Sequence, residues 1–168
     1  MSQQAAVILG IDPGIAITGY GIIVDNEGEA QARAYGVLLT PADEPLPARL
    51  ARLYEQLREL IALHRPTAVA VEELFFARNA RTALTVGHAR GVVLLAVAQA
   101  GLPLYQYKPA EVKLAITGYG GADKRQIQEM VRLLLSLETV PRPDDAADAL
   151  ALALCHFHSH RFQALAPA

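Results

Sequence analysis

Residues 7–21 read VILGIDPGIAITGYG, and this stretch decides how the rest of the chain is interpreted. The apolar run Val7–Ile11 has the pattern of a buried strand, and the charged residue Asp12 follows it directly. Pro13 and Gly14 then predict a turn before a second run, which is rich in threonine and glycine. The end of a strand holds a side chain rigidly, so Asp12 is a candidate metal ligand. The simpler interpretation is that Asp12, Pro13 and Gly14 form an ordinary turn.

The stretch also begins the order of elements along the chain: three strands in a row, followed by strands that alternate with helices. Short turns containing Gly or Asp separate the first three strands, as in an antiparallel meander. Leucines then recur at intervals of three and four residues, which predicts an amphipathic helix. The expected strands are 7–11, 18–25, 30–40, 67–72 and 104–107, and the expected helices are 46–64, 78–100, one beginning near 109, 123–136 and 144–158.

This order of elements predicts an α/β fold with one mixed sheet and helices on both of its faces. The loop 117–122 is rich in glycine and is expected to be flexible, and Asp123 with Gln126 predicts a capping box at the start of the next helix. We expect a single domain over residues 1–168, with 1–5 and 160–168 as frayed ends.

Composition excludes several classes of protein. With 168 residues and 52% hydrophobic residues, the chain can form one domain with a real core and is not disordered. The apolar run Val92–Ala98 is far too short to span a bilayer, and the first residues lack the features of a signal peptide. The one cysteine, Cys155, cannot form an intrachain disulfide and is expected to be an inert packing residue. We therefore expect a cytoplasmic protein without a membrane partner.

Charge is distributed unevenly along the chain, although the net charge is only −2. Residues 1–77 hold 5 Lys or Arg and 10 Asp or Glu, residues 78–132 hold 8 and 3, and residues 133–168 hold 2 and 4. A basic middle between acidic ends is compatible with phosphate binding beside a metal site, and equally with a solvated surface.

Four acidic residues stand out by their positions: Asp12, Glu72, Asp145 and Asp148. Asp12 and Glu72 end predicted strands, whereas Asp145 and Asp148 lie three apart on the last helix and share one of its faces. That helix is apolar beyond Asp148, so we expect it to be buried, and no basic residue is obvious in the sequence as a partner for Asp148.

The four acids have simpler interpretations as well. Asp144 and Asp145 could cap the helix, and Glu72 with Glu73 could be a solvated strand end. An unpaired buried carboxylate costs several kcal/mol, however, so Asp148 must be neutralised, paired or coordinated. A cluster of carboxylate oxygens suits Mg²⁺ or Mn²⁺, and two such ions can support phosphodiester cleavage.

The stretches LGIDPGIAITGYG (9–21), AVEELFFARNARTALTVGHARG (70–91) and DDAADALALALCH (144–156) resemble the RuvC family of bacterial Holliday junction resolvases. The resemblance extends over nearly the whole chain. It implies a ribonuclease-H-like fold with a five-stranded mixed sheet, and a homodimer that nicks two opposed strands of four-way junction DNA in recombination and repair. It also implies that Asp12, Glu72, Asp145 and Asp148 are the catalytic metal ligands, with two Mg²⁺ per subunit that Mn²⁺ can replace. A branch-migration complex is the further partner that we expect.

The resemblance also identifies residues for DNA binding. It implies that Phe75 stacks on a base near the junction centre and that Lys113 and Lys124 contact DNA. Stacking contributes about 1–3 kcal/mol per base, although Phe75 and Phe76 could instead be core residues. Arg78 and Arg125 are further candidates for DNA binding. Glu73 departs from the commoner pattern of the family, and Phe76 adds a second aromatic residue directly after Phe75. These two differences leave the base preference of the enzyme open.

Three other functions are alternatives to the resolvase. A sugar-kinase or actin-like ATPase shares an Asp-x-Gly loop followed by a Thr-Gly-rich hairpin, yet this chain lacks a second such loop. A related enzyme that processes ribosomal RNA precursors is disfavoured by DDAADAL (144–150) and by the loop around Phe75. A junction-binding protein without catalysis is disfavoured by the four intact carboxylates.

Within the helix 78–100, Gly87 and Gly91 permit close helix packing, either inside one subunit or between two.

Overall fold

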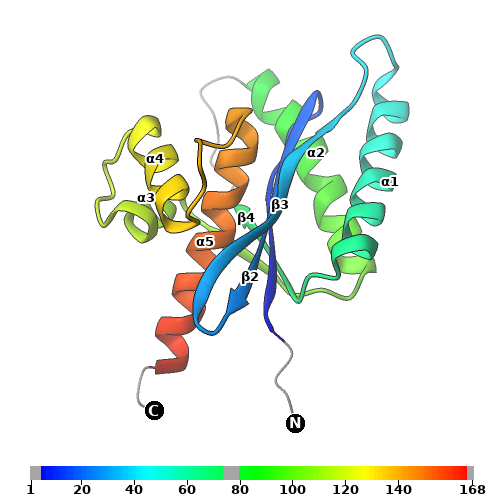
Figure 1. Ribbon diagram of the computed structural model, residues 1–168. Helices are drawn as coiled ribbons and strands as arrows, with labels where there is room; N and C mark the ends of the chain where they lie inside the picture. The colour runs from blue at the N-terminus through cyan, green and yellow to red at the C-terminus, as the bar shows by residue number, and fades with distance from the viewer. Residues whose placement is uncertain (1–4, 74–79, 166–168) are drawn as a thin grey trace.

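The computed structural model describes residues 5–73 and 80–165, with side chains described as far as Arg161 (Figure 1). Its one sheet has five strands in the order β3-β2-β1-β4-β5. The strands are β1 (Val7–Asp12), β2 (Ile17–Asn26), β3 (Glu29–Leu39), β4 (Ala68–Glu72) and β5 (Leu104–Tyr107). The helices are α1 (Leu46–His64), α2 (Ala80–Gln99), α3 (Pro109–Thr117), α4 (Lys124–Leu134) and α5 (Asp144–Leu165).

The sheet is mixed, as the sequence predicted. Strand β1 pairs antiparallel with β2 and parallel with β4, and β4 pairs parallel with β5. Parallel strands end at the same edge of a sheet, and the register pairs Ile11 with Val71. The next residue of each strand is Asp12 or Glu72, so both carboxylates follow buried apolar runs at one edge.

Helices cover both faces of the sheet, with α1 and α2 on one side and α3, α4 and α5 on the other (Figure 1). Side chains alternate between these layers along the strands. In β1, Leu9 packs toward α1 and α2, whereas its neighbour Ile8 packs toward α5. The central strands are therefore apolar on both faces, which explains their continuous hydrophobic runs.

Helix α5 packs with its backbone directly against glycines of the sheet. A Cβ atom at Gly10 would meet the backbone of Ala149 and Ala153, and one at Gly19 would meet the backbone of Asp145. Residues Ala149–Phe157 of α5 are all buried, as the apolar sequence predicted. The contact at Gly19 matters for the site because Gly19 is the strand partner of Asp12.

Helix α2 has a buried side and an exposed apolar side. Ala89, Val93 and Val97 belong to the core, whereas Leu84 and Leu95 are 63% and 52% exposed. Within the described ranges, α2 is also the one helix whose length and composition would allow it to cross a membrane, a test that core helices of soluble proteins also pass.

The structure refines several of the predicted boundaries. The capping box is confirmed, with Asp123 accepting a hydrogen bond from the Gln126 N–H and Gln126 accepting one from the Asp123 N–H. Helix α5 extends beyond the predicted end near His158 and includes part of the segment that was expected to be frayed. Cys155 is buried, and burial raises the pKa of its thiol to about 11, which agrees with an inert packing residue.

Candidate active site at the carboxylate edge of the sheet

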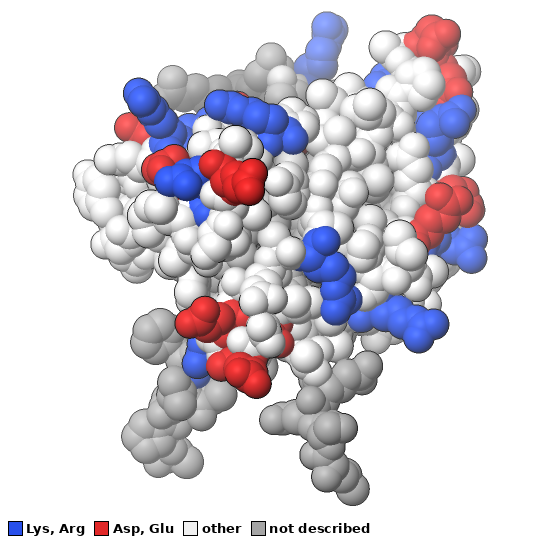
Figure 2. Space-filling model, in the orientation of Figure 1, with Lys and Arg blue, Asp and Glu red and all other residues white. Residues whose placement is uncertain are grey.

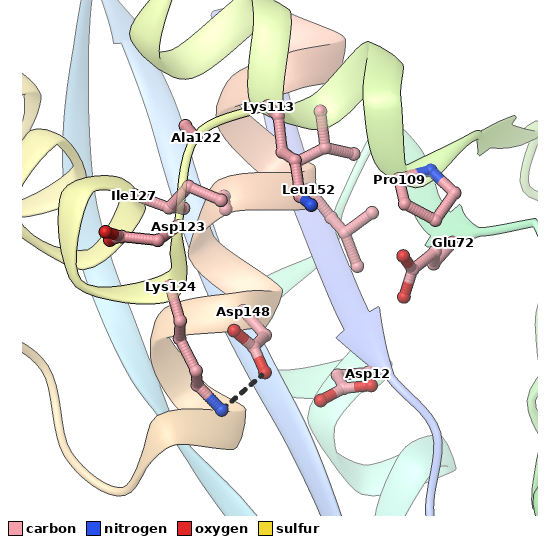
Figure 3. Close-up of a pocket in the computed structure, with 12 residues that line it drawn as sticks. Asp12, Glu72, Pro109, Lys113, Ala122, Asp123, Lys124, Ile127, Asp148 and Leu152 are labelled. Atoms are coloured by element: carbon pink, nitrogen blue, oxygen red, sulfur yellow. Dashed lines mark ion pairs between the residues drawn. The ribbon is translucent and has the colours of Figure 1, made fainter. Parts of the chain in front are cut away.

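Three of the four predicted acids line one cavity of about 290 Å³ (Figure 3). Asp12 comes from the tip of β1, Glu72 from the tip of β4, and Asp148 from the second turn of α5. Figure 3 shows the three carboxylates pointing into the same space. The other described residues that line it are Pro109, Val112, Lys113, Ala122, Asp123, Lys124, Ile127, Ala151 and Leu152.

The fourth acid, Asp145, lies beside this cavity rather than on its lining. It occupies the first turn of α5, where its backbone rests against Gly19. Its charge still acts on the site, since it raises the pKa of Asp12 and of Asp148. The structure thus brings Asp12, Glu72 and Asp148 together in one cavity and leaves Asp145 near enough for its charge to act on two of them.

Burial and mutual repulsion perturb the carboxylates of this site. The pKa of Asp12 is raised to about 7, mainly by burial and then by the charges of Asp148, Asp145 and Glu72. The pKa of Glu72 is raised by burial and by Asp148, and that of Asp148 chiefly by burial. Carboxylates forced together in this way lower their free energy by binding a proton or a cation.

Two lysines supply positive charge to the opposite wall. Lys113 of α3 lowers the pKa of Glu72, which opposes the effect of burial. The Lys124 Nζ atom lies 3.1 Å from a carboxylate oxygen of Asp144 and 3.9 Å from one of Asp148. The expectation that Asp148 has no basic partner was therefore wrong, because α4 packs beside α5 and places Lys124 over its first turns.

The expectation that Asp148 is a buried carboxylate holds only in part. Its side chain is 40% exposed, since it faces the open cavity, while Ala146, Ala147 and Ala149 around it are buried. Asp144 is an ion-paired residue rather than a simple cap, because it contacts Lys124 and also accepts a hydrogen bond of 2.6 Å from Arg142. Figure 2 accordingly shows basic and acidic side chains interspersed over α4 and the start of α5.

The donor chemistry of the site fits a hard divalent cation. Carboxylate oxygens are the ligands that Mg²⁺ and Mn²⁺ prefer, and these have raised pKa values that a cation would lower. Over residues 5–73 and 80–165, however, no three Asp, Glu, His or Cys side chains are already arranged to hold one ion. Lys124 instead lines the cavity beside Asp148 and forms an ion pair with it (Figure 3).

The remaining predicted DNA contacts are only partly described. Arg125 is exposed on α4 and lines a separate surface hollow with Tyr119 and Met130, so it does not join the carboxylates. Phe75, Phe76 and Arg78 lie outside the described residues. Sequence reasoning missed Arg90 of α2, which lines a second cavity of about 240 Å³ with Asp12, Glu72 and Glu73. Its only signal in the sequence is a charge in the middle of an apolar helix.

Comparison with known proteins gives consistent matches. Residues 8–156 match the family model described as crossover junction endodeoxyribonuclease RuvC. A protein of that name from Chloroflexus aurantiacus is 61% identical over 151 residues, which cover 90% of this chain and 92% of that protein. Another from Rubrobacter xylanophilus is 55% identical over 163 residues, covering 97% and 91%.

Solved structures agree with this assignment. RuvC of Thermus thermophilus in complex with Holliday junction substrate has a TM-score of 0.88 and 42% identity, covering 94% of this chain and 96% of that one. The yeast mitochondrial Holliday junction resolvase, at 17% identity and a TM-score of 0.67, shares the fold, covering 90% of this chain and 78% of that one. The expected ribonuclease-H-like fold is confirmed, and the ATPase and ribosomal RNA alternatives are set aside. The chain belongs to the RuvC family of crossover junction endodeoxyribonucleases.

Proposed function

We propose that this resolvase cuts four-way junction DNA at the carboxylate edge of its sheet, with Asp12, Glu72, Asp145 and Asp148 as the catalytic acids. One observation supports this most strongly. Three acids from three separate elements share one cavity, and the pKa of each is raised. Such a site is costly for the fold and is expected where carboxylates serve chemistry.

We propose Mg²⁺ as the cofactor, with two ions per subunit and Mn²⁺ as a substitute. Asp12, Glu72 and Asp148 would hold the ions, with Asp145 completing the set after a side-chain rotation. When bound, such ions activate water and stabilise the leaving oxygen of a phosphodiester. The carboxylates contribute rigid placement, because two of them end strands and two lie on a helix that glycines hold against the sheet.

The lysines of the cavity wall are proposed to bind the DNA backbone. Lys113 and Lys124 face the carboxylates from α3 and α4, so a phosphate entering the cavity would meet both charges. Binding a phosphate would draw Lys124 away from Asp148 and leave that carboxylate free for a cation. Phe75 is proposed to stack on a base beside this site, with Arg78 and Arg125 contacting backbone further away.

The protein is further proposed to act as a homodimer through the exposed side of α2. Leu84, Gly87, Gly91 and Leu95 recur along one side of this helix, and no described atom lies within 4 Å of a Cβ built on either glycine. A helix side with two glycines and no described neighbour would let a second α2 helix approach closely, which supports this contact. A two-fold dimer matches the two-fold junction and supplies two cutting sites. We place this activity in the cytoplasm, beside a branch-migration complex.

A junction-cleavage assay tests the proposed site. A synthetic four-way junction is incubated with excess enzyme and Mg²⁺, and single-turnover nicking of each strand is followed. Asp12→Asn and Glu72→Gln should each lose more than about 100-fold in rate, because loss of a ligand should cost more than loss of its supporting residue. Glu55→Gln is the matched control, since Glu55 is an exposed acid on α1 paired with Arg58. Its rate should equal that of the unaltered protein.

The possible outcomes separate the proposals. Paired nicks in opposed strands that disappear in EDTA would support a metal-dependent resolvase. Tight junction binding without any cleavage would instead support the non-catalytic junction-binding alternative. For the dimer, Gly87→Leu should shift the molecule from dimer to monomer in light scattering while its melting profile stays cooperative. A monomer of about 18 kDa for the unaltered protein, even with junction present, would reject that contact.

A further inference from the structure

Arg90 connects helix α2 to the strand end that carries Glu72. Its Nη1 atom donates a hydrogen bond of 2.6 Å to the backbone carbonyl of Glu72. Its Nη2 atom donates to the side-chain oxygen of Gln106 on the neighbouring strand β5. One guanidinium group therefore joins a helix to the ends of two adjacent parallel strands.

The peptide after Glu72 is held on its other side by the backbone alone. The Glu73 N–H donates a hydrogen bond of 2.7 Å to the carbonyl of Tyr107. The Glu72 carbonyl and the Glu73 N–H belong to the same peptide unit, so that unit is fixed by one bond from α2 and one from β5. Its orientation determines where the Glu72 side chain points, because a rotation of the peptide changes the backbone dihedrals of Glu72.

The guanidinium acts on the backbone of Glu72 rather than on its carboxylate. The charges that shift the pKa of Glu72 are those of Asp148 and Lys113, which line the first cavity with Glu72. Arg90 instead lines the second cavity, beside Pro13, Glu73 and Val86. It is half-buried there, and its neighbour Ala89 belongs to the core, so the helix position that carries it is fixed.

We propose that Arg90 is a positioning residue for the nuclease reaction, which orients Glu72 through its backbone carbonyl and links the active site to the α2 helix. This inference rests on the proposed role of Glu72. It also connects the proposed subunit contact to the active site, because the half-buried Arg90 directly precedes Gly91, which is exposed on the same helix.

Substitution of Arg90 tests the inference in the full-length protein. Arg90→Ala should lower the single-turnover nicking rate by about 10–100-fold, the range typical for residues that orient a ligand. Junction affinity should stay within about twofold, since most affinity comes from phosphate contacts. Hydrogen exchange of the Glu73 amide should become faster, a readout that needs neither DNA nor metal. Arg90→Lys can restore one bond and should recover part of the rate.

Two controls distinguish positioning from loss of charge or of folding. Arg58→Ala removes an exposed arginine that is paired with Glu55, and it should leave both the rate and the Glu73 exchange unchanged. Gln106→Ala removes the second anchor of Arg90 while leaving the bond to Glu72, so it should give a smaller change in the same direction. If Arg90→Ala fails to fold, Gln106→Ala decides the question.

Two results would overturn the inference. An unchanged nicking rate with unchanged Glu73 exchange would show that Arg90 does not orient Glu72. Arg90 would instead be a phosphate contact if Arg90→Ala bound the junction more weakly but cut it at an unchanged single-turnover rate. The slope of log K against log salt would then fall by about 1. The two proposals can also fail separately. If the unaltered protein cuts no junction but Arg90→Ala still speeds exchange of the Glu73 amide, the positioning role is supported and only the proposed function is rejected.

Discussion

The ammonium group of Lys124 lies 3.9 Å from the carboxylate of Asp148, inside the cavity that Asp12 and Glu72 also line (Figure 3). The two side chains are 58% and 40% exposed, so water screens their attraction. Lys124 has a second, closer partner in Asp144 at 3.1 Å. The lysine can therefore leave Asp148 and keep an ion pair, which suits a group that must exchange a carboxylate for a phosphate.

Removing the Lys124 charge should affect both the acids and the DNA. Lys124 lowers the pKa of Asp12 and of Asp148, so Lys124→Ala should raise both values in a carboxyl NMR titration. Junction binding should weaken, and the slope of log K against log salt should fall by about 1. An unchanged slope would mean that Lys124 never meets the DNA backbone.

Asp148→Asn should abolish nicking while junction binding is retained. The amide keeps the shape but is a poorer ligand for a hard cation. In EDTA the variant should melt at the same temperature or higher, because neutralising Asp148 relieves its repulsion of Asp12 and Glu72. A clear drop in the melting midpoint together with retained nicking would make Asp148 a structural ion-pair residue.

Stability of the metal-free protein should depend on pH through Asp12. Its pKa is raised from 3.8 to about 7 on folding, so the folded state binds more protons than the unfolded state between these values. Stability should therefore fall as pH rises from about 4 to about 7 and then level off. Asp12→Asn should remove this contribution. Relative to the unaltered protein, the melting midpoint of the variant should therefore rise by roughly a few degrees at pH 7–8 and change little near pH 4. Melting curves in EDTA across this range would contradict the account if the two proteins responded to pH identically.

Gly10→Ala should damage the fold by pushing α5 off the sheet. A Cβ atom at residue 10 would overlap the backbone of Ala149, and backbone cannot rotate away as a side chain can. Overpacking typically costs about 1–3 kcal/mol, and occasionally more. Gly120→Ala is the control, since among the described residues the atom nearest to its Cβ would be the Ala110 carbonyl oxygen, at 3.9 Å. Chemical denaturation that gives equal stabilities for the two variants would show that α5 can move at little cost.

The sequence predicted most of the fold because its signals are local. The run Val7–Ile11, the leucine spacing of α1 and the capping box at Asp123 each depend on residues close together in the chain. The edge position of Asp12 and Glu72 followed from the same logic, since each comes directly after a buried strand.

The parts that could not be predicted depend on contacts between distant residues. Nothing near Lys124 in the sequence indicates that α4 would place it over Asp144 and Asp148. The exposure of Asp148 depends on an open cavity that β1, β4, α3 and α4 form with α5, and the apolar sequence of α5 gave no sign of that cavity. The two hydrogen bonds of Arg90 likewise depend on where α2 crosses the ends of β4 and β5.

The most direct measurement of the central claim is the position of Mn²⁺ in crystals of the enzyme with a junction, located by its anomalous scattering. We expect an ion within about 2.0–2.6 Å of carboxylate oxygens from Asp12, Glu72 and Asp148, with Lys124 moved from Asp148 to a DNA phosphate. An ion bound elsewhere, or an empty carboxylate edge at a Mn²⁺ concentration that supports nicking, would contradict it.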